Sequence, residues 1–378
     1  MNTLLLAITA ISLLVLIALV LIPRRDEPAD MQPAEDERIS PLLRGINYLL
    51  SDEPDRALQE MVQVARLRSE AAEVYMALGE MFRAKGEYGR AVRIHQNLLA
   101  RPDLPATMRV QAMFALARDF HAGGLLDRAL QHYRKVLDMR SDHVESLEAS
   151  LRIREQSSEW LLAEELLSRL EQVRGASYGS HRAYLFAEVA VQALKSGRDD
   201  EAVRYATRAL ELDSTCAPAR MVMVERGLKE GDFKAVDEAT RTLFTSNPEH
   251  FPLLLPVLLR HKKFAARAGK ALLLELWRQN GSEEMALAWL EAVAERDGRE
   301  PARALASELA YSPSSLRAAL RLQAATGDSD DAEFARDWRS SVKNYVCELC
   351  GVEVKVVRWQ CPQCHAWGTM HPIKGGMA

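Results

Sequence analysis

The chain has 378 residues, of which 48% are apolar and 27% charged, so it can bury a sizeable core and is not disordered throughout. Its net charge of −4 argues against a protein whose main task is to coat nucleic acid. Four of its five cysteines lie within eighteen residues near the C-terminus. That clustering indicates a metal site in a reducing compartment, because a secreted disulfide framework spreads its cysteines through the fold.

The first predicted element is a transmembrane anchor over residues 1–22. Nineteen uncharged residues run from Leu4 to Ile22, and as a helix they span about 28 Å, close to the ~30 Å hydrocarbon core of a bilayer. A cleavable signal peptide is the alternative, but no basic residue precedes the run and no small-x-small cleavage site follows it. Arg24 and Arg25 come directly after the run, which places the rest of the chain in the cytoplasm. Residues 23–40, rich in Pro, Asp and Glu, are predicted to be an exposed linker.

Residues 41–341 are predicted to form an all-α tetratricopeptide-repeat superhelix. Small and aromatic residues recur at spacings of 34 to 39, as in Gly45, Tyr48 and Ala57, then Gly79, Phe82 and Ala91, with Ala129, Ala163 and Ala202 continuing the second small position. Small residues let the two helices of a hairpin cross closely, and stacked hairpins bury the apolar face that one hairpin leaves exposed. About six units are recognisable up to residue 248. The helical period then continues without that signature, as degenerate repeats or as a separate helical cap.

Residues 342–378 are predicted to be a small β domain built on Cys347, Cys350, Cys361 and Cys364. Each C-x2-C pair forms a knuckle whose two thiolates point at one ion, and two knuckles complete a tetrahedral shell. Residues 352–358 alternate and are predicted to form a short hairpin between the knuckles. A domain of this size has too little core to fold alone, so the metal supplies folding free energy. Zinc and a single iron both suit four thiolates.

Neighbouring residues have less specific interpretations. His365 and His371 are predicted to lie at the surface, because four sulfurs already fill the shell. Trp359 and Trp367 are predicted to pack over this β domain, which we call the ribbon, or against the helices. The short connection from a helix over about residues 332–342 to Cys347 suggests that the ribbon folds back onto the array.

Three classes of function compete with that of a scaffold. The sequence has no Gly-rich phosphate loop, no His-Glu-x-x-His and no Gly-x-Ser-x-Gly motif, which disfavours an enzyme, and its many acidic residues are interpreted as solvated helix faces. A redox or metal-sensing protein with an iron–thiolate centre remains the alternative to a scaffold whose groove binds a partner. Nucleic-acid binding is disfavoured because the ribbon's surplus of positive charge is small.

Taken together, the parts resemble the lipopolysaccharide assembly protein B family of Gram-negative bacteria. The residues that carry the resemblance are Tyr345, Cys347, Cys350, Gly351, Trp359, Cys361, Pro362, Cys364, Trp367, Thr369 and the stretch Pro372 to Gly375, with the second repeat from Gly79 to Gln96. The ending after Gly375 departs from that pattern. The resemblance implies a non-enzymatic inner-membrane adaptor, facing the cytoplasm, that regulates lipopolysaccharide biosynthesis.

The same resemblance implies particular partners and a particular metal. The implied partners are a membrane-bound ATP-dependent protease, the lipid A pathway deacetylase whose proteolysis the adaptor promotes, and other lipopolysaccharide synthesis and transport proteins. A homo-oligomer is also left open. The implied cofactor is one iron ion held by Cys347, Cys350, Cys361 and Cys364 in a rubredoxin-like site, with zinc as the substitute.

Overall fold

A computed structural model describes residues 71–327 and 330–373, together with the single positions 44, 45, 48, 51, 56, 59 and 60. Within these residues no helix is long and apolar enough to cross a membrane. The predicted anchor (1–22), the linker (23–40), most of the first repeat and the last five residues lie outside the described part. The chain divides into two units, residues 1–132 and 133–378, and each is described by itself.

The first unit contains helical hairpins packed around a core of small and large apolar side chains. Its helices are α5 (Ala71–Ala84), α6 (Tyr88–Leu99), α7 (Ala106–Ala122) and the beginning of α8 (Leu126–Met139). Ala91 is completely buried beside Phe82, Ile94 and Leu98. The small residue therefore lies where two helices cross, as the repeat pattern predicts.

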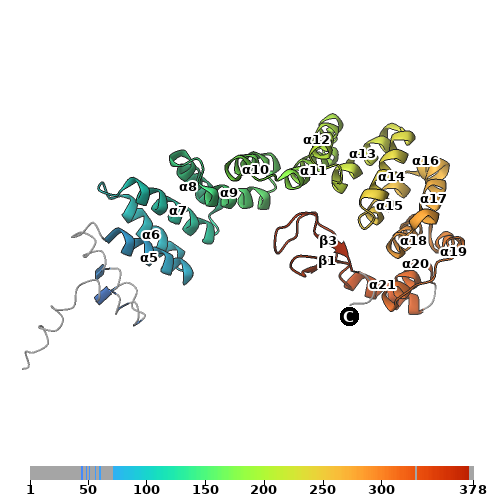
Figure 1. The fold of residues 1–378 in the computed structure, drawn as a ribbon. Helices are drawn as coiled ribbons and strands as arrows, with labels where there is room; N and C mark the ends of the chain where they lie inside the picture. The colour runs from blue at the N-terminus through green and yellow to red at the C-terminus, as the bar shows by residue number, and fades with distance from the viewer. Residues whose placement is uncertain are drawn as a thin grey trace, which may run out of the picture. The chain divides into compact units, whose positions relative to one another are not determined.

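The second unit continues the hairpins and ends in a small β domain (Figure 1). Its helices are α9 (Val144–Gln156), α10 (Trp160–Arg174), α11 (Gly179–Lys195), α12 (Asp199–Leu212), α13 (Ala217–Glu230), α14 (Phe233–Ser246), η1 (Phe251–Leu254), α15 (Leu255–Arg260), α16 (Lys262–Phe264), η2 (Ala265–Gly269), α17 (Lys270–Asn280), α18 (Glu283–Asp297), α19 (Arg299–Glu308), α20 (Leu316–Thr326) and α21 (Asp330–Ser341).

The repeat positions in this unit are buried as predicted. Ala163 and Ala202 have no exposed surface. Gly197, in the turn between α11 and α12, has φ of +73°, a conformation that favours glycine. After residue 250 the hairpins become irregular. A 3-10 turn and a π-helical turn flank α15 and α16, and a large cluster around Phe251, Phe264 and Trp289 forms the core. The regularly spaced small residues of the repeats are absent from the sequence in this same region.

The β domain is a three-stranded antiparallel sheet in the order β2-β1-β3. Its strands are β1 (Tyr345–Cys347), β2 (Glu353–Val354) and β3 (Met370–Pro372), with Tyr345 opposite both Val354 and Pro372. The prediction of a hairpin spanning residues 352–358 is wrong in its extent. Only Glu353 and Val354 form a strand. The tight turn of the first knuckle brings this strand back beside β1, so it pairs with the strand before the knuckle and not with residues 355–358. The third strand, which follows the second knuckle, was not predicted.

Candidate metal centre

Two similar turns position the four cysteines. The N–H of Gly351 donates to the carbonyl of Cys347 at 2.9 Å, and the N–H of His365 donates to that of Cys361 at 3.1 Å. Gly351 has φ of +72°, so the turn of the first knuckle favours a residue without a Cβ. Each turn therefore brings two cysteines of one knuckle onto the same side of the backbone.

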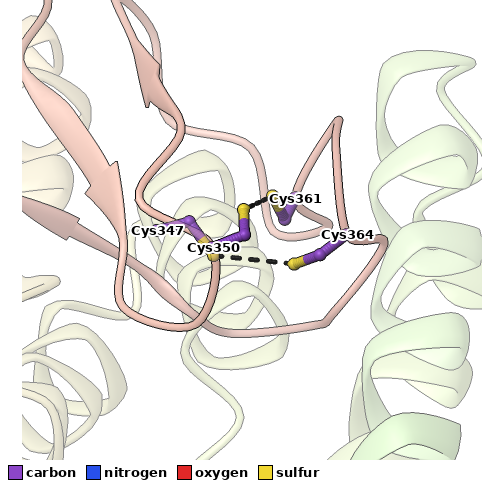
Figure 2. Close-up of side chains that lie close together, drawn as sticks. All are labelled: Cys347, Cys350, Cys361 and Cys364. Carbon is purple, nitrogen blue, oxygen red and sulfur yellow. Dashed lines mark hydrogen bonds between the residues drawn. The ribbon is translucent and has the colours of Figure 1, made fainter.

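The four sulfur atoms all lie within 4.8 Å of one another (Figure 2). The Sγ atoms of Cys347 and Cys364 are 3.7 Å apart, and those of Cys350 and Cys361 are 3.6 Å apart. A tetrahedral ion with metal–sulfur bonds of about 2.3 Å would hold its sulfurs about 3.8 Å apart. The two measured spacings are therefore close to those of one four-coordinate ion, and they do not distinguish zinc from iron.

The surroundings of Cys347 favour the thiolate that a metal needs. Burial raises the pKa of this thiol, but hydrogen bonds from the Thr369 hydroxyl and from the backbone N–H groups of Cys350 and Leu349 outweigh burial and lower the pKa to about 6. The Thr369 Oγ1 lies 3.3 Å from the Cys347 sulfur. Cys347 and Cys361 are buried, whereas Cys364 is exposed, so one edge of the centre faces solvent.

Neither nearby histidine belongs to the cluster. Among the described residues, the four cysteines are the only group of His, Cys, Asp and Glu side chains with a metal-binding arrangement. The prediction that His371 is a surface residue is only partly right. It is half-buried, with its Nδ1 2.6 Å from Glu249 and its Nε2 3.3 Å from Glu348. It thus links the ribbon to the segment before η1.

Glu155 of α9 anchors the ribbon to the helices, and its importance was not foreseen from the sequence. Its side chain is almost fully buried. It accepts hydrogen bonds from Trp367 Nε1 at 3.2 Å and Gln360 Nε2 at 3.0 Å, and His181 Nε2 lies 2.5 Å from it. A buried carboxylate is tolerated only when it is hydrogen-bonded in this way. The interpretation of the acidic residues as solvated helix faces is therefore wrong for Glu155.

Aromatic packing completes the attachment. Trp367 stacks on Tyr184 with ring centres 5.8 Å apart and meets Trp160 edge-on at 5.8 Å. Trp359 lies 6.2 Å from Tyr184 and 5.1 Å from His250. The prediction that both tryptophans pack against the ribbon or the helices is confirmed, and so is the hypothesis that the ribbon folds back onto the array.

His250 fixes the last strand of the ribbon. Its Nε2–H donates to the carbonyl of Met370 at 3.1 Å, which requires a proton on that nitrogen. Burial lowers the pKa of His250, with a further lowering from His371 opposed by the Met370 hydrogen bond and by Glu249. The imidazole is therefore held in its neutral form.

The fold and the centre define a class: a helical-repeat protein that carries a four-cysteine, rubredoxin-type metal-binding domain. A family model described as tetratricopeptide repeat matches residues 74–106, and one described as rubredoxin metal binding domain matches residues 345–372.

Two relatives extend these matches to nearly the whole chain. Both are named lipopolysaccharide assembly protein B, one from Escherichia coli strain K12 (25% identity over 93% of this chain and 94% of the relative) and one from Haemophilus influenzae (25% identity over 93% of each). Over nearly its whole length the chain is therefore similar to proteins named lipopolysaccharide assembly protein B. A solved structure of Pseudomonas aeruginosa pilF is also similar, with 20% identity, a TM-score of 0.31 and coverage of 60% of this chain and 98% of that one. That similarity is too weak to support a functional conclusion.

Proposed function

We propose that the chain is a non-enzymatic adaptor of lipopolysaccharide biosynthesis on the cytoplasmic side of the bacterial inner membrane. The names of its relatives support a role in lipopolysaccharide assembly. The finer proposal is that it promotes proteolysis of the lipid A pathway deacetylase by a membrane-bound ATP-dependent protease, and coordinates other lipopolysaccharide synthesis and transport proteins. Its proposed parts are an anchor (1–22), a linker (23–40), the repeats (41–341) and the metal-binding domain (342–378).

We propose that Cys347, Cys350, Cys361 and Cys364 hold one iron ion, with zinc as the alternative. Bound there, the ion would supply folding free energy to the ribbon rather than a reaction centre, because four thiolates leave no open coordination position. The observation that best supports an adaptor is the attachment of this ribbon to the repeats through the buried Glu155. A metal domain fixed in this way extends a rigid surface for partner proteins.

Membrane attachment would serve the same purpose. A protein confined to the membrane plane meets other membrane proteins at a raised effective concentration, so weak contacts with a protease and its client suffice. Repeat arrays supply long surfaces for such contacts.

The test is the stability of the deacetylase in cells. Deletion of the gene should lengthen the half-life of the deacetylase, measured by immunoblot after protein synthesis is stopped, only while the protease is present. The wild-type chain and the Cys216→Ser variant should restore turnover, because Cys216 lies in the helical core outside the ribbon. The C347S/C350S variant should not. An unchanged half-life after deletion would contradict the proposal, whatever the variants do.

A redox or metal-sensing role is the second candidate. The exposure of Cys364 favours it, because one edge of the centre is open to solvent. The purified protein separates the candidates: a colourless, zinc-loaded protein rules out redox chemistry at this centre. A red, iron-loaded protein whose partners remain the same in both oxidation states leaves the ion structural.

A further inference from the structure

A continuous groove runs between the ribbon and the last helices of the second unit. Two hollows, of about 300 and 520 Å³, share Arg339, Asn344, Lys355 and Val356 among their lining residues. Because they share these walls, they form one groove with the residues after β2 on one side and α18, α20 and α21 on the other. Figure 1 shows these helices beside the strands. We call it the ribbon groove.

One end of the ribbon groove is basic. Arg336, Arg339 and Lys355 line it, and no carboxylate is among the described residues that do so. Among the described residues, Lys355 Nζ donates to the Ser340 carbonyl alone, at 3.1 Å. Arg336 Nη1 is buried without a hydrogen-bond partner in the described part of the chain. Buried donors of this kind are normally satisfied, so this end is suited to an anionic group.

The other stretch of the groove combines apolar side chains with charged ones. Leu253 comes from η1, Ala292 from α18, and Val357 and Ile373 from the ribbon, so apolar side chains line both walls. Such walls enclose a side chain from two sides, which favours an extended peptide over a flat membrane surface.

The acidic residues of this stretch are mostly neutralised. Arg321 lies 2.6 Å from Glu284 and 2.8 Å from Glu291, and Glu249 faces His371. Glu295 is exposed to solvent, where water screens its charge. The groove therefore presents positive charge at one end, and apolar surface among mostly paired charges along the rest.

We propose that the ribbon groove binds an extended segment of a partner protein in which apolar side chains stand next to an acidic residue. The carboxylate would take the hydrogen bonds that Arg336 and Lys355 have to offer, and the apolar side chains would lie between Leu253 and Val357. This proposal goes beyond the proposed function. Its test is direct binding to the purified chain, so its failure would leave the role in lipopolysaccharide biosynthesis untouched.

The test uses the full chain in detergent and a fluorescein-labelled peptide, Leu-Val-Leu-Glu-Asp-Gly with an amidated end. Fluorescence anisotropy should show saturable binding that weakens with salt. The analogue with Gln and Asn in place of Glu and Asp should bind at least about tenfold more weakly. The R336E/K355E variant should lose binding, and the milder R336Q variant should weaken it. Lys234→Glu is the matched charge reversal, since Lys234 is an exposed residue of α14 outside the groove.

Four results would overturn the proposal. The first is equal binding of the acidic peptide and its amide analogue, and the second is an equal effect of Lys234→Glu and R336E/K355E. The third is binding of phosphatidylglycerol vesicles, but not the peptide, through Arg336 and Lys355, which would make the basic end a lipid site. The fourth is peptide binding only after removal of residues 374–378, which would make the chain's own tail the occupant. Circular dichroism of each variant verifies that it is folded.

Discussion

Replacing Glu155 with Gln tests whether the ribbon is attached as described. The variant keeps the shape of the side chain and retains an oxygen for Trp367 and His181, but it turns an N–H2 group toward the amide donor of Gln360. Hydrogen bonds to a charged group contribute about 1.5–3 kcal/mol and neutral ones about 0.5–1.5, so each of the two retained bonds loses about 1 kcal/mol. The buried donor–donor contact costs about 1–3 kcal/mol more. We expect the ribbon's attachment to weaken by about 3–5 kcal/mol.

The assay is guanidinium unfolding of the metal-loaded protein, followed by tryptophan fluorescence, because Trp367 leaves its aromatic neighbours when the ribbon detaches. Glu225→Gln, at an exposed position of α13, is the matched control and should leave the ribbon transition unchanged. The double variant E155Q/Q360E restores a donor–acceptor pair across the interface and should recover about 1–3 kcal/mol. Recovery is partial because Gln360 also donates to the His365 carbonyl at 3.3 Å. If the E155Q variant and the wild-type chain have the same guanidinium midpoint for the ribbon transition, the role given to Glu155 is refuted.

Three further changes probe the ribbon. Gly368→Ala should weaken the attachment by more than Gly351→Ala, because both glycines have positive φ but only a Cβ at Gly368 would overlap the Tyr184 hydroxyl; equal guanidinium midpoints would contradict this. Cys347→Ser should reduce the metal content, measured by plasma mass spectrometry, from one ion per chain to nearly none, and should remove folding free energy on the order of 10 kcal/mol from the ribbon. Burial lowers the pKa of His250. The stability that neutral His250 gives to the ribbon's attachment is therefore fully present above a pH of about 6.5 and is lost as the pH falls below that value. His250→Gln, whose amide still donates, should flatten this dependence of the ribbon midpoint, and an unchanged slope would show that another group titrates.

Local spacing predicted the repeats and the clustering of the four cysteines. The two helices of each repeat cross in the same way, so the small residue at the crossing recurs at a regular spacing in the sequence. Ala91, Ala163 and Ala202 occupy this position and are completely buried. The two C-x2-C pairs are equally local, since each knuckle closes within a few residues. The cluster of four sulfurs follows once a short β domain brings the knuckles together.

The contacts that attach the ribbon to the helices produce no local or periodic pattern in the sequence. Gln360 and Trp367 reach Glu155 across 205 and 212 residues of sequence, and nothing near Glu155 distinguishes it from a solvated glutamate on a helix. Irregular turns such as η2 were equally invisible, because the helical period alone does not fix the hydrogen-bonding pattern at a bend. Tertiary packing, rather than local helix propensity, determines both the contacts of Glu155 and the position of the π-helical turn η2.

The attachment has a consequence for the metal itself. Gln360 immediately precedes Cys361, and Trp367 follows Cys364 by three residues, so the residues that contact Glu155 are fixed by the same knuckle that would hold the ion. If the ribbon folds only with metal bound, any free energy gained by attachment stabilises the metal-loaded state, by linkage. Weakening the attachment by about 3 kcal/mol would then raise the apparent dissociation constant of the metal by about two orders of magnitude. Competition with a chelator should therefore remove the ion from the E155Q variant far more readily than from E225Q, although neither residue is a ligand.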